Sequence, residues 1–170
     1  MVNWVSVPKE LGSVYFFPNE EVSIEEEHLH TFSLSQQFLY DLAYYLNIPS
    51  LKPWENIDDY VHLIIEEWED RKTSLEELFK FRDKKLVQEP MKKSIALLIQ
   101  FLHWVNGAPV KLFPTIEYQQ LAISPVNLEE RLSYILSRPN AFPSYMQLIE
   151  LMKEIEKSYE KNQAIKRIKK

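Results

Sequence analysis

Apolar residues recur at intervals of three and four along most of this chain, and this spacing predicts amphipathic α-helices. The segment 33–46 carries Leu34, Phe38, Leu42 and Tyr45 in this pattern, and Pro49 ends it. The segment 56–71 combines one apolar stripe with an opposite face rich in carboxylates. Further helices are expected over 74–86, 91–106, 115–122, 127–138 and 140–161.

Capping residues and prolines predict where these helices begin and end. The motifs SLSQ at 33–36 and SLEE at 74–77 fit capping boxes, in which the serine hydroxyl accepts a backbone N–H and the later side chain reaches back. Asn56 and Asn127 are good N-caps, and Thr115 is a weaker one. Pro90 is expected to separate two helices, and Gly107 suits the left-handed position after the helix 91–106.

The helix 91–106 is apolar on nearly all sides from Ile95 onward, which predicts a central place in the core. The fold class is therefore all-α: a compact irregular bundle of about six or seven helices in a single domain, 1–170. The segment 1–30 is poorly defined by its pattern, and VYFFP at 14–18 fits either an extended segment or a hydrophobic clamp. The basic tail 161–170 is expected to fray.

Composition removes several classes of function. Two glycines exclude a glycine-rich phosphate loop, and the absence of cysteine excludes disulfides, cysteine-bound zinc and thiol catalysis. The start of the chain lacks the pattern of a signal peptide, and no apolar run approaches the roughly 20 residues of a membrane helix. We therefore expect a cytoplasmic protein with no membrane contact.

Charge is unevenly distributed, although the net charge of −5 disfavours general binding to nucleic acid. The segment 55–77 is strongly acidic, and the C-terminus ends in KRIKK. Solvated helix faces are the usual explanation for such runs, and a partner surface is the alternative. A second alternative is contact with phosphates through the tail and the basic region 80–93, whose cations are Lys80, Arg82, Lys84, Lys85, Lys92 and Lys93.

The segment EEEHLH at 25–30 contains two Glu-x-x-His spacings, Glu25 with His28 and Glu27 with His30. On a helix this spacing directs a carboxylate and an imidazole toward the same metal, as in di-iron bundles. Such a site needs two of these motifs on different helices, whereas both spacings here share one segment. We therefore treat these four residues as weak metal candidates, and we expect no metal or other cofactor.

The acidic helix raises a further alternative, a Mg²⁺-dependent nucleotide hydrolase. Hard Mg²⁺ ions prefer oxygen ligands, and helical enzymes of this type hold the ion between carboxylates of two helices. Glu66, Glu69 and Asp70 would supply one half of the site, and Glu129 with Glu130 are the acceptable second half. No nucleophile motif accompanies them, and His103 on the apolar helix is expected to be a satisfied core histidine.

The element Pro53-Trp54-Glu55 opens the acidic helix and follows the aromatic segment FLYDLAYY. This arrangement resembles the YpoC-like family of small uncharacterised helical proteins from Bacillus and its relatives. The resemblance implies a cytoplasmic bacterial protein and transfers no catalytic residue. Trp54 either closes the core at the start of this helix or lies in a groove that a partner occupies.

The pattern as a whole favours a non-enzymatic protein-interaction module, whose partner is another protein or a second copy of the chain. Exposed aromatics near Trp54 are expected to anchor that partner. The expected contact residues are Trp54, Glu55, Asp58, His62, Glu66, Glu69 and Asp70 on the acidic side, together with the six cations of the basic region.

Overall fold

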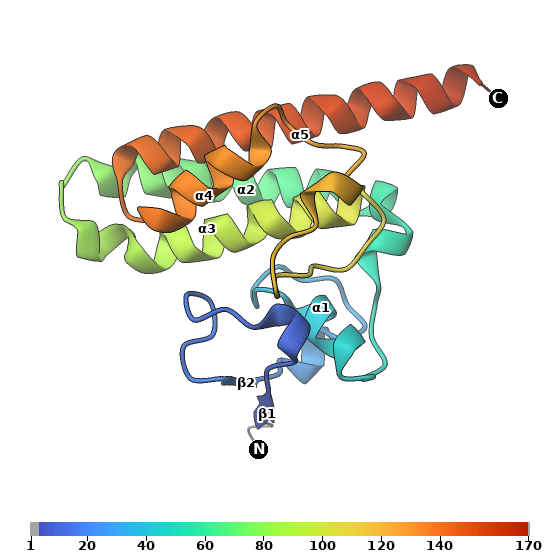
Figure 1. Cartoon of the computed structure of the whole chain (residues 1–170), viewed down its shortest axis with the longest axis horizontal. Helices are drawn as coiled ribbons and strands as arrows, with labels where there is room; N and C mark the ends of the chain where they lie inside the picture. The colour runs from blue at the N-terminus through green and yellow to red at the C-terminus, as the bar shows by residue number, and fades with distance from the viewer. Residues whose placement is uncertain (1–3, 170) are drawn as a thin grey trace.

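A computed structural model describes residues 4–169 of the chain. Within them lie five α-helices and a two-stranded antiparallel sheet (Figure 1). The strands are β1 (Trp4–Ser6) and β2 (Glu21–Ser23), and short 3₁₀ turns include η2 (Glu26–His28), η3 (Pro53–Glu55), η4 (Ile57–Asp59) and η5 (Tyr118–Gln120). The α-helices are α1 (Leu39–Tyr45), α2 (Val61–Phe79), α3 (Lys84–Val105), α4 (Leu128–Ser137) and α5 (Phe142–Ile168).

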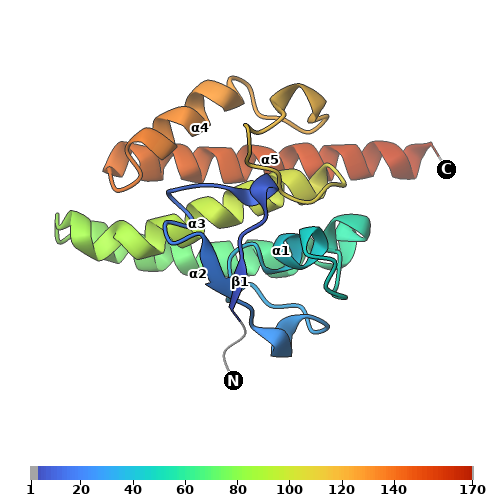
Figure 2. The same ribbon diagram turned by 60° about the horizontal axis from the view of Figure 1, so that its bottom comes forward.

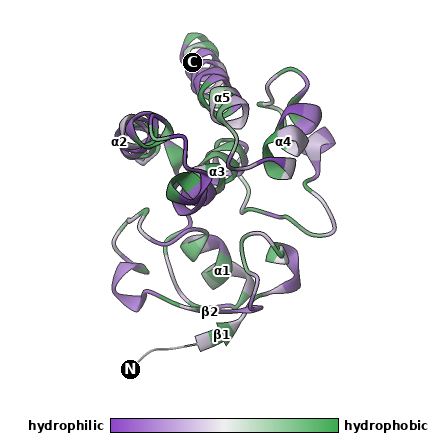
Figure 3. Ribbon diagram, turned by 90° about the vertical axis from the view of Figure 1, so that its left-hand side faces the viewer, coloured by the Kyte–Doolittle hydropathy of each residue, from purple (hydrophilic) through white to green (hydrophobic). Residues whose placement is uncertain are grey.

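The helix α3 forms the centre of the molecule, as the sequence predicts. Every residue from Ser94 to Trp104 is buried. Viewed along the helices, α2, α5 and α4 surround α3 on three sides, and the N-terminal segments with α1 cover the remaining side (Figure 3). Buried apolar side chains from Leu11 to Ile155 belong to one cluster. The prediction of a mostly helical fold is confirmed, whereas the single-domain organisation stays a prediction.

The N-terminal segment is ordered by a sheet that the sequence pattern did not reveal. The strands pair with Val5 opposite Val22. The clamp interpretation of VYFFP is correct, because Phe16 and Phe17 are buried with their ring centroids 5.0 and 5.8 Å from that of Phe38. Residues 1–3 of this segment lie outside the described residues.

The expected break between two helices at Ser74 and the expected stop at Pro90 are both wrong. The helix α2 continues through Ser74, and Pro90 lies inside α3, so five α-helices replace the expected six or seven in the described chain. A proline inside a helix costs roughly 3 kcal/mol through its lost hydrogen bond and its ring. Burial of Val87 and Met91 on either side of Pro90 favours the continuous helix.

Other expected helix starts also move. The helix α1 begins only at Leu39, because the Gln36 side chain bonds the Ser23 carbonyl and the Glu25 N–H instead of closing a capping box. Asn56 precedes the turn η4 and makes no capping bond to backbone, and Asn127 likewise makes none.

The segment between α3 and α4 and the end of the chain agree with the sequence prediction only in part. Gly107 takes the expected left-handed conformation with φ of 76°. The segment 106–127 is mostly irregular in Figure 2, and it holds the turn η5 where a helix at 115–122 was expected. Within its described residues the tail predicted to fray is helical, since α5 continues to Ile168, and Lys170 lies outside the described residues.

Two buried polar side chains hold the centre together. Asp41 Oδ1 accepts bonds from Trp104 Nε1 at 3.1 Å and from the Val110 N–H at 2.6 Å, which ties α1 to α3 and to the chain beyond it. Asp41 Oδ2 is buried without a partner. His103 is a satisfied core histidine as expected, with Nδ1 2.8 Å from the Ile99 carbonyl oxygen, and burial lowers its pKa.

Trp54 belongs to the core, as one of its two predicted roles requires. Its side chain is 6% exposed and meets the Tyr44 ring edge-on, with centroids 5.4 Å apart. Glu55 beside it is exposed. The residue also lines a pocket of about 390 Å³ together with Glu55 and Asp58, and the binding of a partner there stays a prediction.

We expect Trp54→Ala to lower the free energy of unfolding by about 3–5 kcal/mol, since it removes a large buried ring. Urea unfolding followed by circular dichroism measures this change. Trp4→Ala is the matched control, because Trp4 is 62% exposed and its loss should cost less than about 1 kcal/mol. Equal effects of the two substitutions would contradict the core role.

Asp41 should make stability depend on pH, because burial raises its pKa from 3.8 to about 6. Between these values the folded state binds more protons than the unfolded state, so this contribution to stability falls as pH rises. A shift of about 2 units corresponds to a loss of about 3 kcal/mol. Asp41→Asn should lack this fall, so its stability relative to wild type should rise from pH 4 to pH 7. Parallel pH profiles from urea unfolding would refute this.

Candidate functional site

The turn between α2 and α3 carries a surface pocket, which we call the tip pocket. Its volume is about 480 Å³. The turn lies at the end of the helical layer opposite the C-terminus (Figure 1). Five segments (α2, the turn, α3, the loop before α5, and α5) contribute the lining residues, which are Phe79, Arg82, Asp83, Lys84, Val87, Asn140 and Phe142.

Aromatic rings from α2 and α5 build one wall of the tip pocket. The Phe79 ring stacks on Tyr145 at 5.0 Å between centroids and meets Phe142 edge-on at 5.6 Å. The Tyr145 hydroxyl donates to the Lys72 carbonyl at 3.1 Å, which fixes that ring. Aromatic pairs of this kind contribute roughly 0.5–1.5 kcal/mol beyond buried area, so this wall is held in place.

The turn itself has a defined backbone. Successive N–H groups of Lys80, Phe81 and Arg82 donate to carbonyls three residues earlier, and Arg82 takes a left-handed φ of 54°. The Asp83 carboxylate then accepts the Lys85 N–H at 2.9 Å and caps α3. These backbone bonds and the Asp83 cap fix the conformation of the turn. The cations of the turn point into solvent.

The surface around the tip pocket is both basic and apolar. Phe81 is 71% exposed, and Leu86 and Phe142 are also exposed. Lys80 pairs with Glu77 at 2.8 Å, but both side chains are exposed and such pairs contribute little. Exposed cations occupy four of the six positions from 80 to 85, namely Lys80, Arg82, Lys84 and Lys85.

Lys92 and Lys93 do not belong to this surface, so the predicted basic region 80–93 is divided. Lys92 Nζ lies 5.3 Å from the centroid of the Tyr15 ring and 3.6 Å from Glu89. Lys93 lines a separate shallow pocket further along α3, and its carbonyl accepts a bond from Arg71.

The expected acidic surface becomes a groove between the start of α2 and the second half of α5. This acidic groove, of about 720 Å³, brings Asp58, His62 and Glu66 together as expected. Glu69 instead pairs with Lys72 at 3.0 Å, and Asp70 lines the shallow pocket near Lys93. The remaining lining residues are Val61, Ile65, Glu156, Tyr159, Glu160, Gln163 and Arg167.

Contacts between Asp58 and α5 hold this groove in shape. The Tyr159 hydroxyl and the Gln163 amide both donate to Asp58 Oδ1. Burial, followed by the charge of Glu160 and then of Glu69, raises the pKa of Glu156. The groove lining holds four carboxylates and one arginine, so its net charge is negative. Asp58 joins η4 to α5.

The Mg²⁺ site predicted from two acidic helices is not formed. Glu129 and Glu130 lie on α4, which contributes nothing to the lining of the acidic groove. Within the described part of the chain, the one cluster with three metal-ligating side chains in reach of a common ion lies elsewhere, at Glu25, Glu27 and His28.

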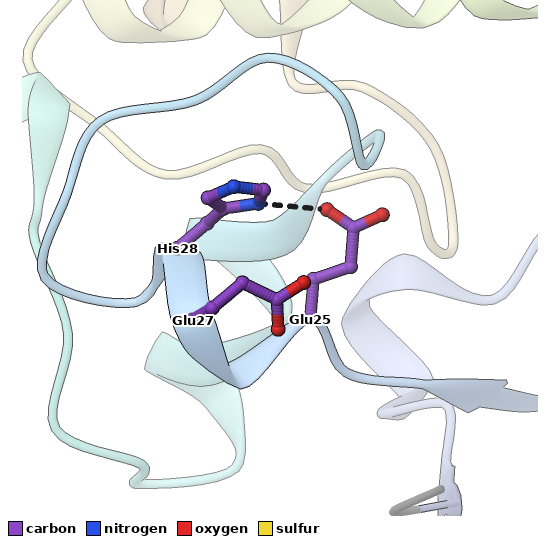
Figure 4. Close-up of side chains that lie close together, drawn as sticks. All are labelled: Glu25, Glu27 and His28. Carbon is purple, nitrogen blue, oxygen red and sulfur yellow. Dashed lines mark hydrogen bonds and ion pairs between the residues drawn. The ribbon is translucent and has the colours of Figure 1, made fainter.

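We call these three residues the Glu/His cluster, and Figure 4 shows the His28 ring directed at Glu25 with Glu27 beside it. His28 Nδ1 lies 3.0 Å from Glu25 Oε2. The Ser35 hydroxyl donates to the same oxygen at 2.6 Å, and it is the main cause of the lowered pKa of Glu25. The cluster lies on the turn η2, and the predicted partner His30 is exposed outside it.

The Glu/His cluster does not form a di-iron site or a catalytic triad. A di-iron site needs a second motif on another helix, and these residues lie on a single 3₁₀ turn and the residue before it. In a triad the serine and the carboxylate contact opposite nitrogens of the histidine. Here Ser35 and Glu25 both approach Nδ1 of His28.

Sequence reasoning identified the tip cations but missed the apolar part of the tip pocket. Phe81 lies off the apolar stripe of the helix expected over 74–86, and this position in the pattern indicates an exposed ring. Phe142 and Asn140 follow the turn by about 60 residues in the chain, and no local pattern joins them to it.

Comparison with known proteins agrees with the resemblance seen in the sequence. A family model described as YpoC-like protein matches residues 58–167, from η4 through nearly all of α5. The chain belongs to the YpoC-like family. A protein of Bacillus subtilis (strain 168) named "Uncharacterized protein YpoC" is 37% identical over 120 residues, which cover 68% of this chain and 71% of that protein.

The YpoC-like match includes every residue that lines the acidic groove and the tip pocket. No solved structure matches this chain. Among the described residues, no helix combines the length and apolar character that crossing a membrane requires.

We expect the His28→Ala, His30→Ala double variant to change the free energy of unfolding by less than about 1 kcal/mol, because partly exposed ion pairs contribute little. Urea unfolding measures this change, and a calorimetric titration with Zn²⁺ compares metal uptake. The two proteins should give the same titration curve. Saturable uptake by wild type that the double variant loses would establish a metal site at the Glu/His cluster.

Proposed function

We propose that this YpoC-like protein is a non-enzymatic interaction module in the cytoplasm, and that its tip pocket binds an acidic segment of a partner protein. The supporting observation is the combination of a pocket with apolar walls and four exposed cations, two on the turn and two at the start of α3. The lack of cysteine is consistent with a reducing compartment.

The chemistry of the tip pocket selects the partner. Phe79 and Phe142 offer apolar surface that an aromatic or aliphatic side chain would cover, at roughly 25 cal/mol for each Å² removed from water. A single anchor of this kind often supplies much of the affinity of an interface. The surrounding cations accelerate the approach of an acidic chain and disfavour a basic one.

The charged groups of the acidic groove support an interaction role over catalysis. Asp58 already accepts bonds from Tyr159 and Gln163 of α5. A carboxylate used in such contacts serves packing between helices.

Nucleic acid remains the alternative partner for the tip cations. The second basic segment, at the end of α5, lies at the opposite end of the molecule (Figure 1). Since α5 alone has 27 residues and a helix rises about 1.5 Å per residue, the two basic segments lie on the order of 40 Å apart. They do not form one continuous phosphate-binding surface, which favours a protein partner.

We expect a random peptide library selected on the wild-type protein to enrich peptides with Phe, Trp or Leu flanked by Asp or Glu. Fluorescence anisotropy should then show roughly tenfold weaker binding, about 1.4 kcal/mol, for Phe142→Ala and for Lys84→Glu, Lys85→Glu. High salt should weaken binding to wild type, because the attraction is partly between exposed charges.

Lys9→Glu, Lys153→Glu is the control, since it changes the net charge equally at two exposed positions away from the tip pocket. Enrichment of peptides without acidic residues, or affinity that the tip variants do not alter, would refute the proposal. A short DNA duplex is tested in parallel, and binding that is tighter than that of the peptides and equally sensitive to the tip variants would assign the surface to nucleic acid instead.

A further inference from the structure

The last turns of α5 extend beyond the rest of the helical layer (Figure 1). All residues from Ala164 to Lys169 are exposed, including Ile165 and Ile168, and Ile168 is 83% exposed. Packing usually supplies most of the stability of a helix, so exposed isoleucines on a projecting end indicate a surface that another molecule covers.

The second half of α5 also changes sign along its length. Glu156 and Glu160 come first, with one lysine, Lys157, between them, and the basic residues Lys161, Lys166, Arg167 and Lys169 follow without a further acidic residue. Two copies of such a helix placed antiparallel bring the acidic part of each against the basic part of the other. Parallel copies would instead place like charges side by side.

The acidic groove lies beside the same part of α5 and provides a surface on which the end of a second α5 can bind. Val61 and Ile65 supply apolar contacts within it, and Glu66 and Glu160 are exposed carboxylates on its two sides. Its volume of about 720 Å³ suits several side chains rather than a whole helix. The isoleucines and lysines at the end of a second α5 match these apolar and acidic groups.

We propose that two copies of this chain associate through the ends of α5, each end lying in the acidic groove of the other copy. Such a contact is isologous, because groove and helix end exchange roles across a two-fold axis. Pairing Glu160 with Lys166 or Arg167 of the other copy places this axis near residues 163–164. The association is weak and salt-dependent, because the contact is small and rich in exposed charge.

This dimer is independent of the proposed binding at the tip pocket. The two surfaces lie at opposite ends of the helical layer (Figure 1). A monomeric protein that binds acidic peptides, or a dimer that binds none, would therefore separate the two proposals.

The absence of native cysteine permits a direct test by cross-linking. Ala164→Cys places one thiol near the proposed axis, one helical turn from both Glu160 and Ile168. Mild oxidation should yield a disulfide-linked dimer at low salt and much less of it at high salt, because a disulfide requires Cα atoms within about 7 Å. The control is Ser133→Cys, an exposed position on α4, which should stay monomeric under the same conditions.

Sedimentation velocity over a range of concentrations provides a second measurement without new cysteines. Lys166→Glu, Lys169→Glu should be monomeric, as should Glu66→Lys, Glu160→Lys, and an equimolar mixture of the two should recover the dimer. Circular dichroism verifies that each variant is folded. The proposal would be overturned if wild type stays monomeric at all concentrations and the Ala164→Cys variant forms no cross-link, or if both charge variants retain a dimer.

Discussion

The structure depends on the need to keep water away from α3 on every side. Eleven consecutive residues, Ser94 to Trp104, are buried, so a single neighbouring helix could not cover them. Three helices and the N-terminal segments share this task. The same burial explains Asp41, because the indole N–H of Trp104 needs an acceptor once it leaves water, and a carboxylate of α1 supplies it.

Covering α3 also determines where charge is placed. The helices α2 and α5 turn their apolar sides toward the core, and their charged residues remain outside or at their ends. One end of the pair holds the four cations and exposed rings around the tip pocket. The other holds the acidic groove and the projecting end of α5. The basic tip pocket and the acidic groove therefore lie at opposite ends of the helical layer.

The errors in helix boundaries at Ser74 and Pro90 share one physical origin. Ser74 and Pro90 carry local signals to begin or stop a helix. The apolar face of the helix continues on both sides of each residue, and its burial contributes more free energy than these local signals cost. The strands β1 and β2 were missed because their pairing joins residues about 17 positions apart, and each strand has only three residues. Short strands of this kind carry almost no periodic pattern.

The sequence alone determined the helical class, the central place of α3, the family resemblance and the individual residues that carry exposed charge. Those properties follow from local periodicity and composition. Only the tertiary structure decided that Trp54 is buried and that Lys92 lies apart from the basic surface at the tip. It also decided which distant residues complete each site. Phe142 joins the tip pocket and Glu156 joins the acidic groove because α5 packs back along α2, and contacts between segments so far apart in the chain leave no local pattern to read.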